Sequence, residues 1–191
     1  VQGLKGILAD IENGTLHIDM EAEDIHTFIE GELTKRIGDN GKRLHTSRSR
    51  NDQVAVDIKL YLKKEVVNVK KLVVDLIKVI ADKAEKYSET VMPGYTHLQR
   101  AQPITFGHHL LAYGEMLLRD VSRLEDCLKR MDEMPLGSCA LAGTTYPIDR
   151  TITAELLGFE RITNNSLDGV SDRDYCIEFA AGLSIIMVHL S

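Results

Sequence analysis

Several residue types are scarce in this chain of 191 residues. It has no tryptophan, only four prolines, and aromatic residues make up 5%. No apolar run reaches the roughly 18 residues that a membrane-spanning helix needs, and no signal peptide is visible. We therefore expect a cytoplasmic protein without a membrane partner. Glycine and proline are both missing from residues 42–92, which leaves room for one very long helix.

Cysteine is also rare, and the three residues Cys127, Cys139 and Cys176 show no metal-ligand spacing. An odd number without such spacing indicates free thiols in a reducing compartment rather than a disulfide framework. The pair His108-His109 does not indicate a metal site either, because adjacent residues on a helix do not face one side. We expect these two histidines to pack locally and no metal to bind.

The balance of charge is acidic, with a formal net charge of −6. This argues against a general nucleic-acid partner, whose binding domain is usually basic. With 43% hydrophobic and 27% charged residues, the composition is that of a soluble globular protein. The chain begins at Val1 and ends at Ser191 inside an apolar periodic run, so we interpret it as a piece of a longer protein.

Apolar periodicity predicts helices along most of the chain, and no strand-like alternation stands out. The longest helix is expected to begin near Asp52 and to run to about Tyr87, a length of roughly 50 Å. Its apolar residues alternate steps of four and three, as in helical bundles: Leu62, Val66, Val69, Val73, Leu76 and Ile80. We predict an all-α fold, a long-helix bundle that requires partner helices.

Two shorter helices are expected before the long one, at residues 4–11 and 25–37, with Asp24 as the N-cap of the second. These lead to a predicted division into a small N-terminal helical domain, residues 1–45, and a central long-helix bundle domain, residues 46–191. The second domain is expected to be truncated at its C-terminal end.

A second bundle helix is predicted after Pro103, running to about Met131. Gly107 and Gly114 within it cost about 1 kcal/mol each relative to alanine. We expect close approach of a neighbouring backbone to compensate for both.

A connection and a short helix at residues 149–157 follow the second bundle helix. Residues 164–169 are expected to form a loop. Ser171 with Asp174 resembles a capping box that opens the last helix.

Residues 93–103, predicted as a turn bounded by prolines, separate the two long helices and hold adjacent Thr96 and His97. Imidazole is the side chain best suited to exchange a proton near neutral pH. The neighbouring polar residues can orient a substrate: Gln99, Arg100 and Gln102. The alternative is a plain helix–helix turn with an exposed histidine.

The polar stretch before the long helix is the second candidate site. Its side chains are hydrogen-bond donors suited to carboxylates, namely Arg48, Ser49, Arg50 and Asn51. The alternative is a solvated basic surface.

These two stretches together resemble one enzyme family. Residues 45–54 (His-Thr-Ser-Arg-Ser-Arg-Asn-Asp-Gln-Val) closely resemble the arginine-and-asparagine motif of argininosuccinate lyase, and residues 93–109 look like its second signature. The Thr-His-Leu-Gln core is shared across the fumarase/aspartase superfamily, whereas Arg-Ser-Arg-Asn-Asp-Gln selects this family. Supporting matches lie at residues 23–27, 142–150 and 165–174.

The resemblance implies the fumarase/aspartase long-helix fold and reversible cleavage of argininosuccinate to arginine and fumarate, as in arginine biosynthesis. It implies no metal or organic cofactor. It also implies a homotetramer whose long helices form a central bundle and whose active sites are each shared between subunits.

Roles for individual residues follow from the same resemblance. Asn51 and Thr96 are expected to hold substrate carboxylates, with Ser49, Arg50 and Gln99 as further candidates. His97 is the candidate proton donor to the departing guanidinium nitrogen, and His26 is expected to bind substrate or to orient the loop. Donors aimed at the carboxylate stabilise the carbanion that forms beside it.

The chain departs from the family pattern in two respects. Ser47 stands where the family most often has glycine, which serine can replace if the backbone keeps φ below zero. The third family signature, which carries the proposed catalytic serine, is expected beyond Ser191, and a substrate-binding serine loop is expected before Val1. The fragment alone should therefore be inactive.

Three alternatives stay open. One is a non-catalytic, crystallin-like structural protein on the same scaffold, as in the lens δ-crystallins that resemble this lyase. Another is a different fumarate-releasing lyase of the superfamily, and the most distant is a helical nucleic-acid-binding protein.

Overall fold

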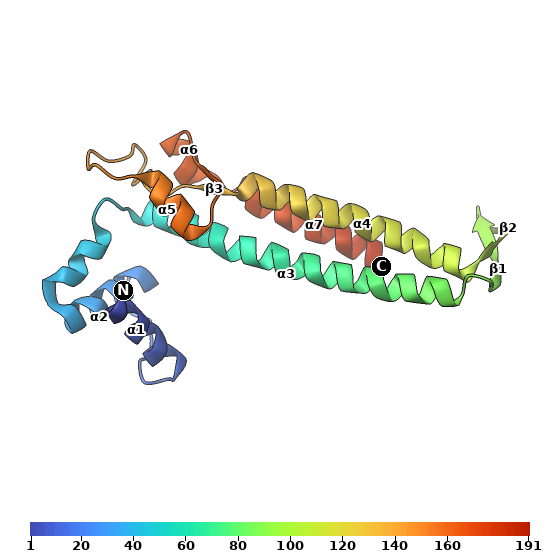
Figure 1. Cartoon of the computed structure of the whole chain (residues 1–191), viewed down its shortest axis with the longest axis horizontal. Coiled ribbons are helices and arrows are strands. Elements are labelled where there is room, and N and C mark those ends of the chain that lie inside the picture. Colours follow the sequence, from blue (N-terminus) through green and yellow to red (C-terminus); the bar gives the residue numbers. More distant parts are fainter.

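Three long helices form the rod on which the rest of the molecule is built. The structure is a computed structural model that describes residues 1–191, and it is mostly helical, as predicted. The helices are α3 (Arg50–Lys86), α4 (Phe106–Met131) and α7 (Asp174–Leu190), which lie side by side (Figure 1). With 37 residues, α3 is roughly 55 Å long. The expected long-helix bundle is confirmed.

The rod is held together by one apolar cluster to which all three helices contribute. Its buried members are Val66, Val73, Leu117, Leu124, Cys127, Met131, Tyr175, Phe179 and Ile186. They meet because apolar residues recur every three or four positions, so that one stripe of each helix faces its neighbours.

The two glycines of α4 differ in their surroundings. A Cβ on Gly107 would lie 2.4 Å from the Ala84 carbonyl oxygen, so only glycine lets the two helices approach this closely. The predicted close approach is confirmed there. At Gly114 the prediction is wrong, because the nearest atom to such a Cβ is the side-chain Cγ2 of Ile80, at an ordinary 3.8 Å.

The N-terminal elements are α1 (Gln2–Glu12), α2 (Ile25–Ile37) and the 3-10 helix η1 (Gly38–His45), which lie beside the start of α3 (Figure 1). Asp24 caps α2, as predicted, because its carboxylate accepts a hydrogen bond of 2.6 Å from the Thr27 N–H. The division of the chain into domains at residues 45 and 46 stays a prediction.

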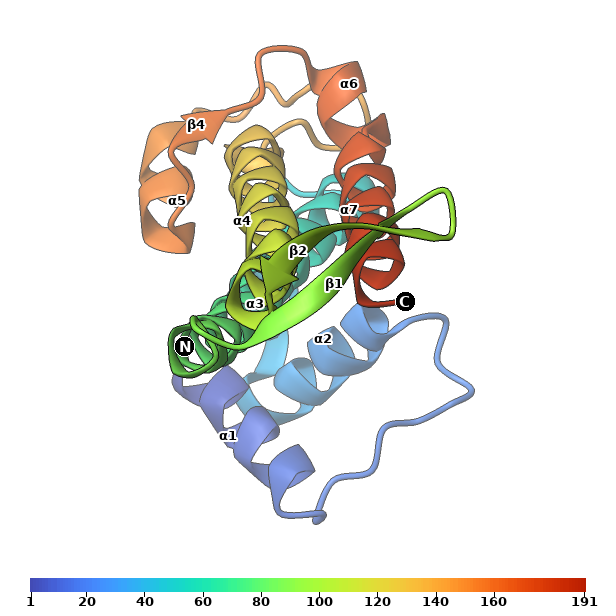
Figure 2. The ribbon, with the colours of Figure 1, turned by 90° about the vertical axis from the view of Figure 1, so that its right-hand side faces the viewer.

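The stretch between α3 and α4 is a β-hairpin, which corrects the prediction of a simple turn. Strands β1 (Val91–Thr96) and β2 (Gln99–Thr105) pair antiparallel, with Pro93 opposite Pro103. Both strands are edge strands, where proline is tolerated because no neighbour needs its missing N–H. The hairpin crosses the ends of the two helices (Figure 2).

The segment between α4 and α7 holds short elements. Strands β3 (Glu133–Met134) and β4 (Arg161–Ile162) pair parallel, and α5 (Arg150–Leu157) lies between them in sequence. α6 (Ser166–Ser171) occupies most of the predicted loop, because the Asn165 side chain caps it by accepting from two backbone N–H groups.

The capping box predicted at Ser171 and Asp174 is wrong. Ser171 ends α6, where its hydroxyl donates to the Leu167 carbonyl at 2.8 Å. The Asp174 N–H instead binds the Asp172 carboxylate at 2.8 Å, and Arg173 stands at the N-cap of α7 without a side-chain hydrogen bond.

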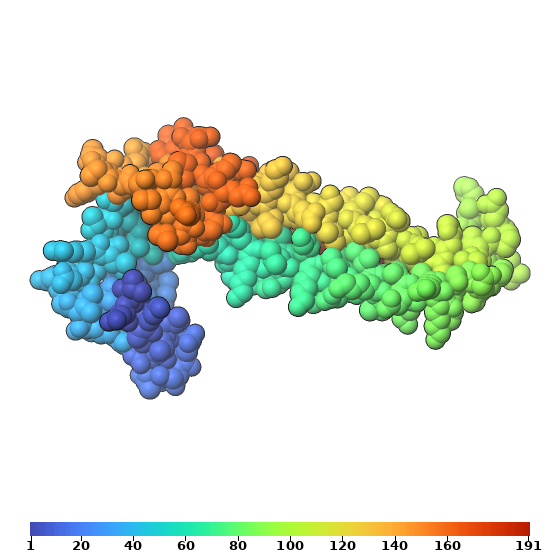
Figure 3. All heavy atoms as spheres, in the orientation of Figure 1, coloured from blue at the N-terminus to red at the C-terminus, as the bar shows by residue number.

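The surface view shows mass concentrated at one end of the rod and a projecting hairpin at the other (Figure 3). Helix faces that carry large apolar side chains remain open along the rod, including Leu72 (69% exposed) and Val188 (71% exposed). None of the helices combines the length and the apolar character needed to cross a membrane.

Candidate functional site

The start of α3 is organised by its own first turn. Ser49 is the N-cap, and its hydroxyl accepts from the Asn51 N–H at 3.3 Å. The Asp52 carboxylate accepts from the Ser49 N–H at 2.9 Å, which completes a capping box. The helix therefore begins two residues earlier than predicted, and the candidate Arg50 and Asn51 side chains lie in its first turn.

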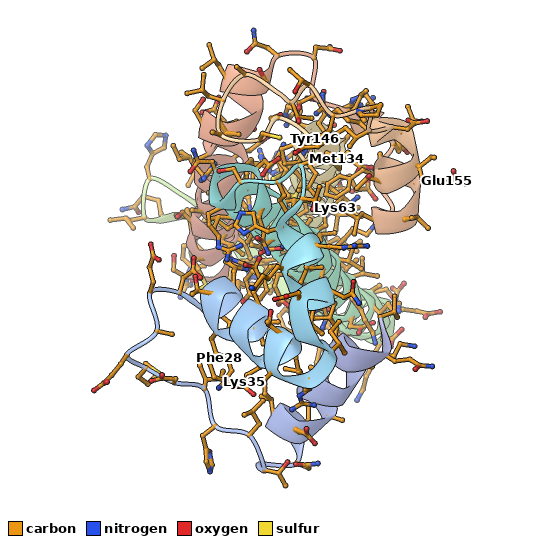
Figure 4. All side chains as sticks on the ribbon, turned by 90° about the vertical axis from the view of Figure 1, so that its left-hand side faces the viewer. Phe28, Lys35, Lys63, Met134, Tyr146 and Glu155 are labelled. Atoms are coloured by element: carbon orange, nitrogen blue, oxygen red, sulfur yellow. The ribbon has the colours of Figure 1, made fainter.

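Asn51 is the exposed polar residue of this turn. Its Nδ2 donates a hydrogen bond of 2.9 Å to the Ala140 carbonyl, in the loop that follows β3. Because a carbonyl can only accept, this contact fixes which end of the amide faces the loop. Figure 4 looks onto this end of the molecule, with Phe28 of α2 on one side of α3 and Tyr146 of the loop on the other.

Arg50 is engaged by acidic groups of the N-terminal helices. Its guanidinium contacts Glu30 at 2.9 Å and Asp24 at 3.3 Å. Glu30 also accepts from Arg48 and His45, each at 3.1 Å. The hydrogen bond from Arg50, supported by His45, lowers the pKa of Glu30 to about 2. Glu30 therefore connects α2 to the start of α3, a role that no sequence pattern indicated.

His26 lies next to the same turn. Its Nδ1 is 2.8 Å from the Gln53 side-chain nitrogen, and its Nε2 is 3.5 Å from the Asp57 carboxylate. The structure thus gathers His26, Ser49, Arg50 and Asn51 from the list of predicted site residues at one end of the rod.

The other predicted residues, Thr96, His97 and Gln99, lie in the hairpin at the opposite end, and all three are exposed. His97 and Leu98 have φ values of 51° and 60°, as the two central residues of a tight hairpin turn require. The backbone of residues other than glycine is strained at these positive φ values. Leu98 is also 97% exposed.

A cavity of about 440 Å³ lies between the hairpin and the first turns of α4. Its polar lining comes from Tyr95, Thr96 and Gln102 of the hairpin and from His108 and His109. The ring centroid of His109 also lies 5.5 Å from that of Tyr113, in agreement with the predicted local packing.

One chain does not bring the two groups of residues together. The length of α3, roughly 55 Å, separates the turn that holds Asn51 from the hairpin that holds His97. No side chain is long enough to bridge that distance.

Ser47 does not meet the condition under which serine replaces glycine without strain. Its φ is 57°, in the left-handed region, and its buried hydroxyl has no hydrogen-bond partner. Its carbonyl lies 3.3 Å from the Cys139 sulfur, and Cys139 also has a positive φ of 53°. Two strained residues thus face each other beside Asn51.

Sequence reasoning also missed Asp52, which it treated only as the approximate start of a helix. The spacing of Ser49 and Asp52, a serine followed three residues later by an acid, is the signal that would have placed the N-cap. No comparable signal marks the hydrogen bonds that the Asp52 carboxylate accepts from the Gly137 and Cys139 N–H groups.

Comparison with known proteins bears on all these residues. A family model described as Lyase matches residues 1–191. Argininosuccinate lyases from Desulforamulus reducens and Heliobacterium mobile are each 60% identical over the whole chain, which covers 42% of their length. The same enzyme from Acinetobacter baumannii is 60% identical, and the chain covers 40% of it.

Solved structures agree in fold. An EDDS lyase in complex with formate superimposes with a TM-score of 0.86 at 30% identity, over 98% of this chain and 37% of that one. A fumarate lyase:delta crystallin from Brucella melitensis bound to cobalt gives 0.72 at 23% identity, over 86% and 39%. The chain spans about two fifths of the relatives it matches, and it belongs to the lyase family, within which its resemblance to argininosuccinate lyase is confirmed.

Proposed function

We propose that the complete protein is an argininosuccinate lyase, which reversibly eliminates fumarate from argininosuccinate to give arginine, as in arginine biosynthesis. The observation that carries the proposal is the 60% identity to enzymes of that name over all 191 residues, which include both candidate motifs. Three free cysteines support a reducing, cytoplasmic location.

In this proposal the two ends of the rod have different tasks. Asn51 keeps one amide N–H free, and Ser49 keeps its hydroxyl hydrogen free, because each uses only part of its hydrogen-bonding capacity inside the chain. These donors suit a substrate carboxylate. Donors aimed at the carboxylate next to the departing proton stabilise the carbanion that forms there.

His97 is proposed to supply a proton to the departing guanidinium nitrogen, with Thr96 and Gln99 holding the substrate beside it. Their exposure on the hairpin leaves all three side chains open to a ligand. His26 is proposed to assist at the other end through Gln53, whose side chain it contacts. Arg50 contributes mainly through its contacts with Glu30 and Asp24, which hold the turn in place.

We propose that the active site forms between copies of the chain, in a homotetramer. The roughly 55 Å between Asn51 and His97 supports this, because the two can act on one substrate only if they come from different subunits. Exposed apolar side chains along the rod, such as Leu72 and Val188, provide a surface for such packing.

The proposal is tested with the full-length protein, incubated with arginine and fumarate and followed by mass spectrometry. We expect argininosuccinate to accumulate with the wild type and not with His97→Asn. Mixing full-length Asn51→Ala with His97→Asn subunits should then restore activity, because some sites receive both intact residues. Full activity of each variant alone would contradict the assignment.

A second candidate is another fumarate-releasing lyase. It is favoured by the EDDS lyase neighbour, 30% identical over 98% of the chain, a variant of which has been solved with bound fumarate. Replacing arginine by a panel of other amines in the same assay distinguishes the two, since argininosuccinate lyase should form adducts with arginine alone. A complete chain that forms no adduct at all would favour the crystallin-like structural protein.

A further inference from the structure

A buried carboxylate connects the first turn of α3 to a loop far away in the sequence. Asp52 is 0% exposed and accepts three backbone hydrogen bonds. One comes from Ser49 in its own turn, at 2.9 Å. The other two come from Gly137 at 3.0 Å and Cys139 at 2.7 Å. No cationic side chain forms an ion pair with it, so this charge is satisfied by backbone N–H groups.

The loop that Asp52 holds is the same loop that orients Asn51. The Cys139 N–H binds Asp52, and the carbonyl of the next residue, Ala140, accepts the hydrogen bond from Asn51. Asn51 and Asp52, adjacent in one helical turn, thus form hydrogen bonds with the adjacent loop residues Ala140 and Cys139. If the loop moves away from Asp52, the Ala140 carbonyl moves away from Asn51.

The hydrogen bonds that Asp52 accepts stabilise a loop whose backbone is strained at Cys139. Cys139 has a φ of 53°, which residues other than glycine adopt at an energetic cost, whereas Gly137 adopts its φ of 88° without strain. Arg150 holds the start of the loop by donating from Nε to the Leu136 carbonyl at 2.8 Å. No other side chain donates to or accepts from the backbone at both Gly137 and Cys139.

We infer that Asp52 is a positioning residue for the substrate-carboxylate site: by fixing residues 137–140 it sets the direction in which the Asn51 amide presents its free N–H. This inference rests on the proposed function, because it takes Asn51 as a ligand of the substrate carboxylate. Asp52 itself is buried and touches no substrate.

The test compares full-length Asp52→Asn with Asp120→Asn. Both replace a buried aspartate, 0% and 1% exposed, by its isosteric amide, but Asp120 lies in the rod and pairs with His189 and Arg123. Both variants should unfold at lower temperature. Only Asp52→Asn should lower kcat/KM, by about tenfold or more, since that corresponds to one lost charge-assisted hydrogen bond.

A double-variant cycle separates this inference from the proposed function. If Asp52 acts through Asn51, then adding Asp52→Asn to Asn51→Ala should lower kcat/KM little further, whereas independent roles would make the two effects multiply. Multiplying effects, or an unchanged kcat/KM in Asp52→Asn, would overturn the positioning role. Wild-type kcat/KM in Asn51→Ala alone would instead remove the proposed role of Asn51.

Two measurements keep the inference testable if Asp52→Asn does not fold. Asp52→Glu keeps the charge but moves the carboxylate, so it should fold and have a lower kcat/KM than the wild type; an unchanged kcat/KM would overturn the inference. Hydrogen exchange of the wild-type protein should show slow exchange at the Gly137 and Cys139 amides, because both donate to a buried carboxylate. Fast exchange at these two amides would contradict the inference without any substitution.

Discussion

The two ends of the rod that carry the candidate residues are built in opposite ways. At the start of α3, hydrogen bonds within the chain join Glu30 to Arg50 and join Asp52 to Ser49 and to the loop at residues 137–140. At the other end, the hairpin presents His97 and Leu98 to solvent on a strained turn. Contacts within one chain therefore hold the side chains at the start of α3 in position. The side chains of the hairpin are exposed and, in our proposal, contact another subunit.

The largest expected effect comes from the hairpin. His97→Asn in the full-length protein should lower kcat by about a hundredfold or more, because general acid catalysis typically contributes that much. Its stability should hardly change, since the side chain is exposed. Steady-state kinetics and thermal unfolding measure the two, and wild-type turnover would remove His97 from its role.

At the start of α3, Glu30→Gln should reduce the free energy of unfolding by about 3 kcal/mol. The reason is that His45, Arg48 and Arg50 lose their charged acceptor. The folded-state pKa of Glu30 is depressed from 4.5 to about 2. This stability is therefore fully present above about pH 4.5 and is lost as the pH falls through about 2.

Urea unfolding of wild type and Glu30→Gln over this range of pH checks the prediction. The difference between them should shrink toward pH 2. A difference that is constant with pH would show that Glu30 is not ionised in this cluster. Glu65→Gln is a suitable control, because Glu65 contacts only Asn68 within its own helix.

Helix α4 offers a matched pair of glycines, Gly107 at its junction with the hairpin and Gly114 in its interior. Gly107→Ala should cost about 2 kcal/mol, because the new Cβ would lie 2.4 Å from the Ala84 carbonyl oxygen. Gly114→Ala should instead stabilise the helix by up to about 1 kcal/mol, since its nearest neighbour is 3.8 Å away. Chemical denaturation of both variants measures the contrast, and equal effects would contradict the close approach.

The smallest expected effect tests the strain beside Asn51. Ser47→Gly should raise the free energy of unfolding by about 0.5 kcal/mol, because glycine adopts a φ of 57° without strain while losing more chain entropy on folding. Ser47→Ala removes the same buried, unpaired hydroxyl but keeps the strain, so it serves as the control, and Ser47→Gly should be the more stable of the two variants. Thermal unfolding compares them, and a loss of stability in Ser47→Gly would show that the serine side chain itself is needed.

Much of the helical architecture was predictable because it is encoded locally. The four-and-three spacing from Leu62 to Ile80 predicted α3, and Asp24 predicted the start of α2. The hairpin was not predictable in the same way. Its turn contains His97 and Leu98 rather than the Asn-Gly that usually marks such turns, and the sequences of its strands do not alternate regularly between apolar and polar residues.

The candidate site was predictable as a set of residues but not as a geometry. Recognition of the motif singled out Asn51, His97 and their neighbours, yet nothing local indicates that Arg50 is held by Glu30, 20 residues earlier. The same is true of Asp52, which binds a peptide group 87 residues later. Such contacts depend on how packed elements meet, which short patterns do not describe.

By itself, the sequence determined a rod of long helices and two polar stretches rich in hydrogen-bond donors, at residues 48–51 and 96–102. Both are local features, because periodicity and motifs depend on a few neighbouring residues. Only the tertiary structure decided that these stretches lie at opposite ends of a helix of 37 residues, and which donors remain free. The reason is physical: a hydrogen bond between distant residues forms only where packing of the apolar faces has already placed the backbone.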